Sequence, residues 1–473
     1  MPTQRRLLDL LALGIAPAAA GGLLAYAHTN RLGWGALVAL SILAVSQLFG
    51  QTRYPLHLMP VARLAGSALS ALAGALLAWA AGLAMGVGSL GDSLIPAALG
   101  ASAVAVLGFW VRGTFDQRVA VRIAVVGDAD VVEGLDREIT MAKIHGYYLV
   151  GRISVGERAP MDLGLDIPYL GAIEDLREIV RSHRIELLVH AQGPTKRISR
   201  LEIFEGVGAA CLDMRVGLIE ASQFYEELFG HVPAGQINAA WFQYLMHPRY
   251  RRTPPVSKRL FDVAVGALAL ALAAPLIAVF ALAIKLSDGG AIFYRQWRVG
   301  EGGREFQVLK LRSMRQGAQE EGARWSHRDD DRVLPVGRLM RKLHVDELPQ
   351  IVNVLRGDMT LVGPRPEQPA LVSELERRFR YYERRSLVKP GITGWAQVRC
   401  GYAGSKQGSA WKLCHDLYYL KHRSLLTDLM IICETLRALG QRAQYEVEPP
   451  SEQFIVLGEP GSADGAALAS WFE

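Results

Sequence analysis

The stretch LFDVAVGALALALAAPLIAVFALAIKL, residues 260–286, is almost entirely apolar. As a helix rising about 1.5 Å per residue, it is long enough to cross the hydrocarbon core of a bilayer. Pro275 lies near its middle, where it removes a hydrogen bond and bends a helix. Basic residues flank both ends, Arg259 before and Arg295 after, so a full crossing would leave one of them outside. We therefore expect a re-entrant helix that breaks near Ala274–Pro275 and returns to the cytoplasmic face, with a full fifth span as the alternative.

Three charged residues mark the start of this segment. Lys258 and Arg259 lie four and three residues before Asp262, on one face of a helix. They can neutralise one another at the membrane interface, with long side chains reaching toward the headgroups. They can also bind the phosphate of a lipid, and the sequence leaves both roles open.

The first quarter of the chain is also apolar. Each of four segments there has about the 20 residues that a membrane-spanning helix needs. A buried soluble bundle is disfavoured because so long a stretch has almost no polar face. Basic residues cluster before the first segment and after the last, so the positive-inside rule places the N-terminus and everything after residue 112 in the cytoplasm. The sequence predicts a four-helix transmembrane bundle in residues 1–115, with spans at 7–27, 32–50, 62–88 and 93–111.

Composition and charge indicate which class of partner the protein binds. The chain has 473 residues, a net charge of +6 and 50% hydrophobic residues. Its basic residues lie beside apolar segments or inside compact motifs, which favours membranes and phosphorylated substrates over nucleic acid. The four cysteines form no CxxC pair, so we expect free thiols in a reducing compartment rather than a zinc site.

Residues 116–245 alternate between strand-like and helix-like segments. This pattern predicts a doubly wound parallel sheet in a Rossmann-like α/β module. Gly127 follows the first strand, but the next residues do not complete GxGxxG, so we expect a structural or regulatory module rather than a dinucleotide site. The expected strands are 121–127, 147–154, 185–191 and 213–219, and the expected helices are 130–143 and 174–183.

Five polar motifs follow in the second half of the chain. Taken singly, each has an ordinary explanation: DELPQ could begin a helix with Asp346 as its N-cap, and GPRP could be a rigid turn. Together and in this order they resemble the bacterial sugar transferase family. Its members are polyprenyl-phosphate hexose-1-phosphate transferases, which begin exopolysaccharide, capsule and O-antigen repeat units. The motifs are KRLFD (258–262), LKLRSM (309–314), DELPQ (346–350), GDMTLVGPRP (357–366) and KPGITGWAQV (389–398).

The four spans and the α/β module resemble the long form of this family. The resemblance implies an α-rich monotopic catalytic domain, here 258–445, reached through a linker at 246–257 and followed by a tail at 446–473. It implies a multi-pass protein of the bacterial inner membrane whose catalytic domain faces the cytoplasm. It also implies a two-step reaction with Mg²⁺ between a UDP-sugar and polyprenyl phosphate. Carried over to this sequence, Asp346 is the nucleophile, Glu347 is its partner, and both are candidate metal ligands.

This chemistry calls for cations, because it brings a carboxylate and a diphosphate together. We expect basic residues of the motifs to bind the diphosphate, with arginine offering bidentate geometry. One departure from the family is visible just before the Asp-Glu pair: relatives usually have a small hydroxyl residue near there, so His344 or Val345 is unusual. The candidate substrate-binding residues are Lys258, Arg259, Asp262, Lys310, Arg312, Arg341, Pro364, Arg365 and Asp416.

Two other functions are compatible with a membrane protein of this organisation. A nucleotide-sugar dehydratase or epimerase would need a glycine-rich loop and a YxxxK pair, and Tyr402 with Lys406 lies far from any such loop. A non-catalytic scaffold of polysaccharide assembly would not need the Asp-Glu pair. The sequence does not choose the sugar, although family precedent favours glucose or galactose. Packing surfaces on the membrane helices would allow a homodimer.

Overall fold

The structure is a computed structural model of the chain, which divides into two compact units. The first comprises Met1–Gln192 and Lys196–Gly230, and the second Gly193–Thr195 and His231–Glu473. The structure describes residues 16–29, 36, 38–42, 103, 107, 121–127, 129–141, 147–155, 167–191, 200–214, 216–233, 237, 241, 255–315, 332–379, 381–400 and 406–440.

A five-stranded parallel sheet forms the centre of the first unit, as the alternating pattern predicts. Its order is β3-β2-β1-β4-β5, with every neighbouring pair parallel. The central strand β1 has its last five residues fully buried, which explains why it is a continuous apolar run. The strands are β1 (Val121–Gly127), β2 (Tyr147–Ser154), β3 (Tyr169–Ala172), β4 (Leu187–Ala191) and β5 (Gly217–Glu220).

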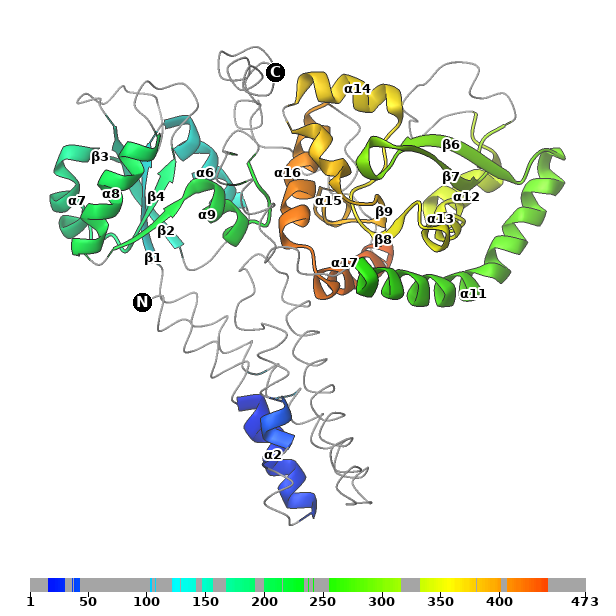
Figure 1. The fold of residues 1–473 in the computed structure, drawn as a ribbon, viewed down its shortest axis with the longest axis horizontal. Coiled ribbons are helices and arrows are strands. Elements are labelled where there is room, and N and C mark those ends of the chain that lie inside the picture. The colour runs from blue at the N-terminus through cyan, green and yellow to red at the C-terminus, as the bar shows by residue number, and fades with distance from the viewer. Residues whose placement is uncertain are drawn as a thin grey trace. The chain divides into compact units, whose positions relative to one another are not determined.

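Helices cover both faces of this sheet (Figure 1). On one face, Val126 and Leu188 pack with Ile179 and Val207 from two of the helices. The predicted strand at 213–219 is wrong in its first residues, because a helix continues to Met214 before β5 begins. The short edge strand β3 has no counterpart in the sequence prediction. The helices are α6 (Ala129–Met141) and α9 (Ala221–Leu228) on one side, and α7 (Leu176–Ser182) and α8 (Arg200–Met214) on the other, with the short η3 (Ile173–Asp175) before α7.

Gly127 has a structural role in this sheet. Its φ is +150°, and a Cβ atom there would lie 1.6 Å from the carbonyl oxygen of Ala191 on β4. The close approach of two neighbouring strands therefore accounts for this glycine without any bound dinucleotide.

The predicted membrane bundle lies mostly outside the described residues. Helix α2 (Ala16–Thr29) covers the second half of the first predicted span, and residues 38–42 of the second span are helical. The spans predicted at 62–88 and 93–111 lie outside the described residues, apart from residues 103 and 107.

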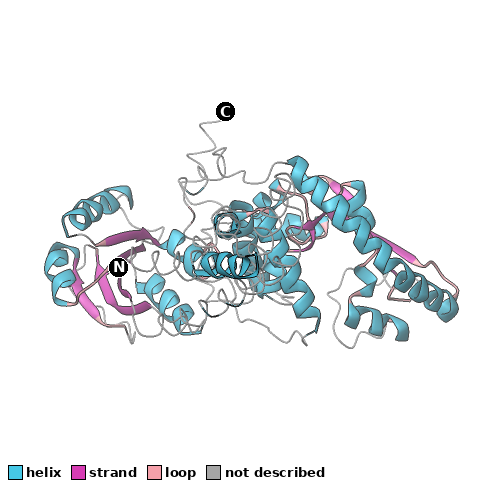
Figure 2. Cartoon of the chain, turned by 90° about the horizontal axis from the view of Figure 1, so that it is seen from below, coloured by secondary structure: helices cyan, strands magenta, loops and turns pink. Residues whose placement is uncertain are grey.

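The second unit is α-rich, with short strands between its helices (Figure 2). Strands β6 and β7 form an antiparallel hairpin, and β8 and β9 form a short parallel pair. The unit contains α11 (Pro255–Asp288), β6 (Phe293–Val299), η6 (Glu301–Gly303), β7 (Glu305–Leu311), α12 (Pro335–Leu343), η7 (Val345–Glu347), α13 (Gln350–Arg356), β8 (Thr360–Val362), α14 (Pro369–Arg378), η8 (Tyr382–Leu387), β9 (Gly391–Thr393), α15 (Trp395–Cys400), α16 (Lys406–His422) and α17 (Leu425–Gly440).

Helix α11 contains the apolar segment at residues 260–286. It continues through Pro275, so the predicted break at Ala274–Pro275 is wrong. The helix bends instead (Figure 1), as a proline that lacks one hydrogen bond and crowds the preceding turn requires. Its most hydrophobic window has a mean hydropathy of 2.7 and is only 11% buried, and among the described residues α11 alone is long and apolar enough to cross a membrane. Its exposed apolar side chains include Leu260, Leu268, Leu272, Leu276, Val279, Leu282 and Leu286.

The second half of α11 joins the core beneath the Asp-Glu pair. Phe280 and Ile284 pack with Leu311 of β7, Met340 of α12 and Val345 of η7. The helix that carries the exposed apolar surface is thereby attached directly to the segment that holds the candidate catalytic residues.

Candidate active site

A sharp change of chain direction presents Asp346 and Glu347. Helix α12 ends at Leu343, and its C-cap residue His344 adopts a left-handed conformation with φ of 55°. The next residue, Val345, is buried in the core, and the short η7 turn then exposes part of each acid. His344 thus terminates α12, and Val345 packs the start of η7 into the core. Asp346 is not the N-cap of α13, because that position belongs to Pro349.

Two cations hold the Glu347 carboxylate. Lys310 Nζ of β7 donates to Oε1 at 2.8 Å, and Arg365 donates to both oxygens, at 2.7 Å to Oε1 and 3.3 Å to Oε2. Burial by itself would raise the pKa of Glu347, but Arg365 and Lys310 hold it well below its usual value. Glu347 is therefore ionised at neutral pH and fixed in orientation.

Asp346 has a different environment. Within the described part of the chain it has no ion pair and accepts no hydrogen bond from another side chain. Burial and the charge of Glu347 raise its pKa, while Lys310 and Arg341 oppose the rise. A carboxylate that lacks a direct partner and lies beside a cationic cluster is suited to nucleophilic attack on phosphorus.

A further cation approaches from α12. Arg341 Nε donates to Ser313 Oγ at 3.0 Å, and its positive charge lowers the pKa of Asp346. The sequence predicts Lys310, Arg341 and Arg365 as substrate-binding residues, and the fold brings these three to the Asp-Glu pair.

Arg298 of β6 is a member of this cationic group that the sequence prediction missed. It donates to the carbonyl oxygen of Pro366 at 3.1 Å, and its charge acts on Arg365 and Glu347. Burial lowers the pKa of Arg298. In the hairpin register Arg298 and Lys310 lie on the same face, but this relationship becomes visible only once the pairing of β6 with β7 is known.

Two interlocked loops position Arg365. Strands β8 and β9 pair in parallel, and the Gly363 N–H donates to the Thr393 carbonyl at 2.9 Å. The Gly391 N–H donates to the Pro364 carbonyl at 2.9 Å. The GPRP turn and the KPGITG loop, distant in sequence, therefore form one rigid support.

The charged residues at the start of α11 lie at the far end of α13 from the Asp-Glu pair. Arg259 donates to the Val354 and Leu355 carbonyls, both at 2.6 Å, and so satisfies the C-terminus of α13. Lys258 pairs with Asp262 at 3.1 Å and with Asp428 at 2.7 Å. Asp262 in turn accepts from Thr360 Oγ1 at 2.6 Å. Lys258 and Asp262 thus neutralise one another, as the sequence allowed, whereas Arg259 binds main-chain carbonyls. Lipid-phosphate binding stays a prediction.

Two other predicted residues have protein partners of their own. Arg312 pairs with Asp288 at the end of α11, with one contact of 2.7 Å. Asp416 of α16 pairs with Arg385 at 2.8 Å in the interior of the unit. Pro364 contributes the Gly391 contact described above. The structure therefore brings neither Arg312 nor Asp416 into direct contact with the Asp-Glu pair.

The Asp-Glu pair offers carboxylate oxygens to a divalent cation. The described residues contain no group of three or more His, Cys, Asp or Glu side chains that could hold a metal. Mg²⁺ commonly binds through one or two carboxylates together with substrate phosphates and water. Asp346, with Glu347 beside it, fits that arrangement, because its oxygens are not engaged by a described side chain.

Comparison with known proteins identifies relatives of this chain. The family model for bacterial sugar transferases matches residues 253–442. A UDP-glucose:undecaprenyl-phosphate glucose-1-phosphate transferase of Xanthomonas campestris pv. campestris is 31% identical over 347 residues, which cover 68% of this chain and 68% of that protein.

Two further relatives match over shorter segments. A UDP-glucose:undecaprenyl-phosphate glucose-1-phosphate transferase of Caulobacter vibrioides is 43% identical over 41% of this chain and 73% of its own length. A UDP-N-acetylgalactosamine-undecaprenyl-phosphate N-acetylgalactosaminephosphotransferase of Aeromonas hydrophila is 44% identical over 38% of this chain. The matched segment spans 43% of the length of the Aeromonas protein.

Proposed function

The chain belongs to the bacterial sugar transferase family, and from this premise we propose that it transfers a sugar 1-phosphate from a UDP-sugar to undecaprenyl phosphate, releasing UMP. The observation that carries the proposal is the division of roles in the Asp-Glu pair. Glu347 is held by Lys310 and Arg365, whereas the half-buried Asp346 beside it is available for attack.

The reaction proceeds in two displacements. A carboxylate oxygen of Asp346 attacks the phosphorus that bears the sugar, and the bond between that phosphorus and the UMP oxygen breaks. UMP leaves with the electron pair, and the sugar phosphate remains on Asp346 as an acyl phosphate. An oxygen of the lipid phosphate then attacks the same phosphorus and releases the Asp346 carboxylate.

The surrounding cations lower the cost of bringing these anions together. Arg341 and Arg298 add positive charge around the pair, and Lys310 and Arg365 also hold Glu347 in place. Charge stabilisation that is already in position requires little reorganisation as the phosphoryl group moves. Mg²⁺ held by Asp346, Glu347 and the diphosphate would neutralise part of the phosphate charge.

The membrane brings the two substrates together. We propose that α11 enters and leaves the cytoplasmic leaflet as a bent re-entrant helix, and that the predicted N-terminal spans make the protein multi-pass. Its exposed leucines would face acyl chains, while its second half packs under η7. Asp346 would then lie where a soluble UDP-sugar and a lipid phosphate can both reach it. This placement suits the first membrane step of exopolysaccharide, capsule or O-antigen synthesis.

The experiment measures UMP release by the full-length protein in membranes supplied with a panel of UDP-sugars, with and without undecaprenyl phosphate. We expect turnover only when the lipid is present. Without the lipid, UMP should form in an amount no greater than the enzyme, with sugar phosphate bound to the protein. Failure to release UMP with any UDP-sugar would overturn the proposed function.

The catalytic assignment is tested with Asp346→Asn. We expect this variant to form neither UMP nor the covalent adduct, because an amide is a poor nucleophile. The matched control is Asp175→Asn, the same change at an exposed site in the first unit, which should keep wild-type activity. Wild-type turnover by Asp346→Asn would remove Asp346 from its role.

A further inference from the structure

A buried arginine, Arg385, contacts the main chain of the GPRP turn. Arg385 of η8 donates from Nη2 to the carbonyl oxygen of Arg365 at 2.9 Å. Its Nε and Nη2 atoms also donate to Asp416 Oδ2, at 3.1 and 2.8 Å, and its Nη1 donates to Tyr382 Oη at 2.6 Å. All three guanidinium nitrogens are thus engaged, and the Arg385 residue is only 8% exposed.

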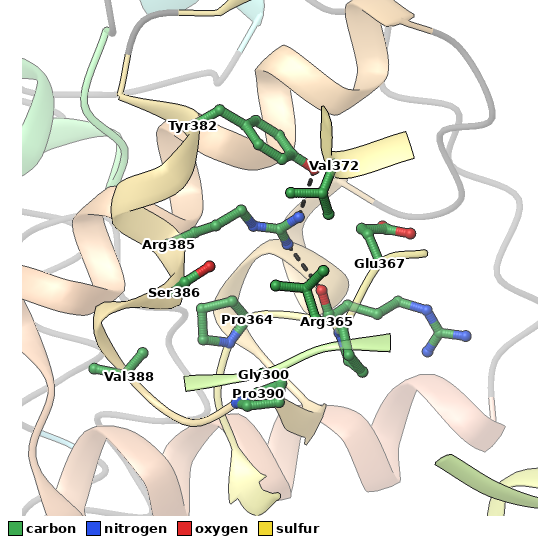
Figure 3. A pocket seen from close by; sticks show the side chains of 12 residues that line it. Gly300, Pro364, Arg365, Glu367, Val372, Tyr382, Arg385, Ser386, Val388 and Pro390 are labelled. Carbon is green, nitrogen blue, oxygen red and sulfur yellow. Dashed lines mark hydrogen bonds between the residues drawn. The ribbon is translucent and has the colours of Figure 1, made fainter. Parts of the chain in front are cut away.

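Figure 3 shows the geometry of this contact. The Arg385 guanidinium lies over the Arg365 carbonyl, whereas the Arg365 side chain extends away from Arg385. At its far end, the Arg365 guanidinium is the group that holds Glu347. The main chain of one residue therefore connects a buried arginine to a catalytic carboxylate.

The backbone of Arg365 is restricted by the proline on either side of it and by Arg385. Pro364 and Pro366 have fixed φ angles, and a residue before proline is restricted to extended conformations. Within that restricted range, Arg385 binds the carbonyl oxygen of Arg365 and so holds the orientation of the peptide group that follows it. Arg298 binds the following carbonyl, that of Pro366, at 3.1 Å, so two arginines hold successive carbonyls of one turn.

We propose that Arg385, oriented by Asp416, is a positioning residue that sets the place of the Arg365 guanidinium against Glu347. The inference rests on the proposed sugar-phosphate transfer. A buried ion pair adds little net stability compared with apolar side chains of the same volume. Positioning is therefore the effect that distinguishes this pair from ordinary packing, and Arg385 need not touch the substrate to exert it.

The test is a double-mutant cycle on kcat/KM for UMP release by the full-length protein in membranes. One arm is the paired change Arg385→Gln with Asp416→Asn, which removes both charges and leaves neither buried alone. The other arm is Arg365→Lys. If Arg385 acts through Arg365, each arm should lower kcat/KM by about tenfold or more. The combined variant should then be little worse than Arg365→Lys alone.

Three results would overturn the inference: unchanged activity in the paired variant, losses that multiply in the combined variant, or an equal loss in the control. The control is Arg384→Gln, at the neighbouring exposed arginine, which pairs with Glu383. A merely structural role for Arg385 would give multiplied losses, because general destabilisation does not depend on the residue at 365.

Arg385→Lys covers the case in which the paired variant fails to fold. Lysine keeps a positive charge opposite Asp416, but one ammonium group cannot reproduce the forked contacts to both Asp416 and the Arg365 carbonyl. We expect Arg385→Lys to fold and to show the same dependence on Arg365, and wild-type kcat/KM would overturn the inference. If the wild type itself releases no UMP, the proposed function fails; if it does and the losses multiply, only this inference fails.

Discussion

The Arg365 guanidinium donates to both carboxylate oxygens of Glu347, at 2.7 and 3.3 Å. The two residues are 18 positions apart and come from different loops. Arg365 thus binds Glu347, whereas no described side chain binds the adjacent Asp346. Two neighbouring carboxylates thus receive different environments, which is how one site can supply both a positioned charge and a nucleophile.

Replacing Arg365 with lysine tests the bidentate contact. An ammonium group keeps the charge but cannot span two carboxylate oxygens in the planar geometry of a guanidinium. We expect Arg365→Lys to lower kcat/KM for UMP release by about 10- to 100-fold, which is the usual scale for loss of a preorganised charge contact. Arg384→Lys, at an exposed position, is the matched control. An Arg365→Lys variant with wild-type kcat/KM would show that charge alone is sufficient.

The pH dependence of activity reports on Asp346. In the proposed mechanism this carboxylate must be ionised to attack. Burial together with Glu347 raises its pKa, while Lys310 and Arg341 lower it. Arg341→Gln removes one lowering charge, so the pKa of Asp346 should rise further and the acid limb of the kcat/KM profile should move to higher pH. The loss of activity should be greater at acidic than at alkaline pH.

Arg338→Gln serves as the control for that profile, because Arg338 is exposed one turn earlier on α12. Its acid limb should coincide with that of the wild type. An acid limb for Arg341→Gln that stays in place or moves to lower pH would contradict the electrostatic role assigned to Arg341.

Replacing Gly391 with alanine tests whether the GPRP turn and the KPGITG loop are held together. A Cβ atom at this position would lie 2.1 Å from the Gly363 nitrogen and 2.4 Å from the Thr393 carbonyl oxygen. Gly391→Ala should therefore push the loops apart and reduce the free energy of unfolding by about 1–3 kcal/mol, as overpacking does. Activity should fall as well, because the GPRP turn carries Arg365. Thermal unfolding and UMP release, measured together, check both effects.

Gly206→Ala on α8 is the matched control, since nothing lies within 4 Å of a Cβ atom placed there. It should leave stability equal to or slightly above that of the wild type. A Gly391→Ala variant that behaves like Gly206→Ala would mean that the two loops move independently.

Cysteine labelling tests the re-entrant arrangement of α11. Val256 and Phe293 lie on either side of the apolar segment and are 70% and 47% exposed, so Val256→Cys and Phe293→Cys should accept a membrane-impermeant reagent. Gly290 is less suitable, because a side chain there would meet the Arg312 guanidinium. Cys433→Ser supplies the background, since Cys433 is the exposed thiol among the four cysteines.

Both introduced cysteines should react only from the cytoplasmic side of oriented membrane vesicles. Reaction of one from each side would show that α11 crosses the membrane. The unmodified Cys433→Ser background, which should take up little reagent from either side, controls for labelling of the buried thiols.

Local sequence patterns predicted a large part of the fold and of the candidate site. The apolar run of β1 and the polar motifs around Asp346, Lys310, Arg341 and Arg365 could be interpreted directly. Hydrophobic periodicity and short motifs depend on neighbouring residues, and these remain adjacent whatever the fold.

Other features depended on residues that only the fold brings together. Pro275 predicts a break, yet α11 continues, because its second half is held by Phe280 and Ile284 packing against β7 and η7. Arg298 and Arg385 carry no distinguishing local signal, since an arginine in a strand or a turn is usually a solvated surface residue.

Local patterns in the chain were enough to indicate the kind of protein, through an apolar segment with flanking charges, a parallel α/β module and an Asp-Glu pair among basic motifs. The tertiary structure alone decided which cation binds which acid, with Lys310 and Arg365 on Glu347 and Arg385 on Asp416. The two kinds of interaction differ in the separation along the chain over which they act. Backbone preference and hydrophobic pattern act between near neighbours in the chain, whereas an ion pair depends on distances that exist only after strands and loops have packed.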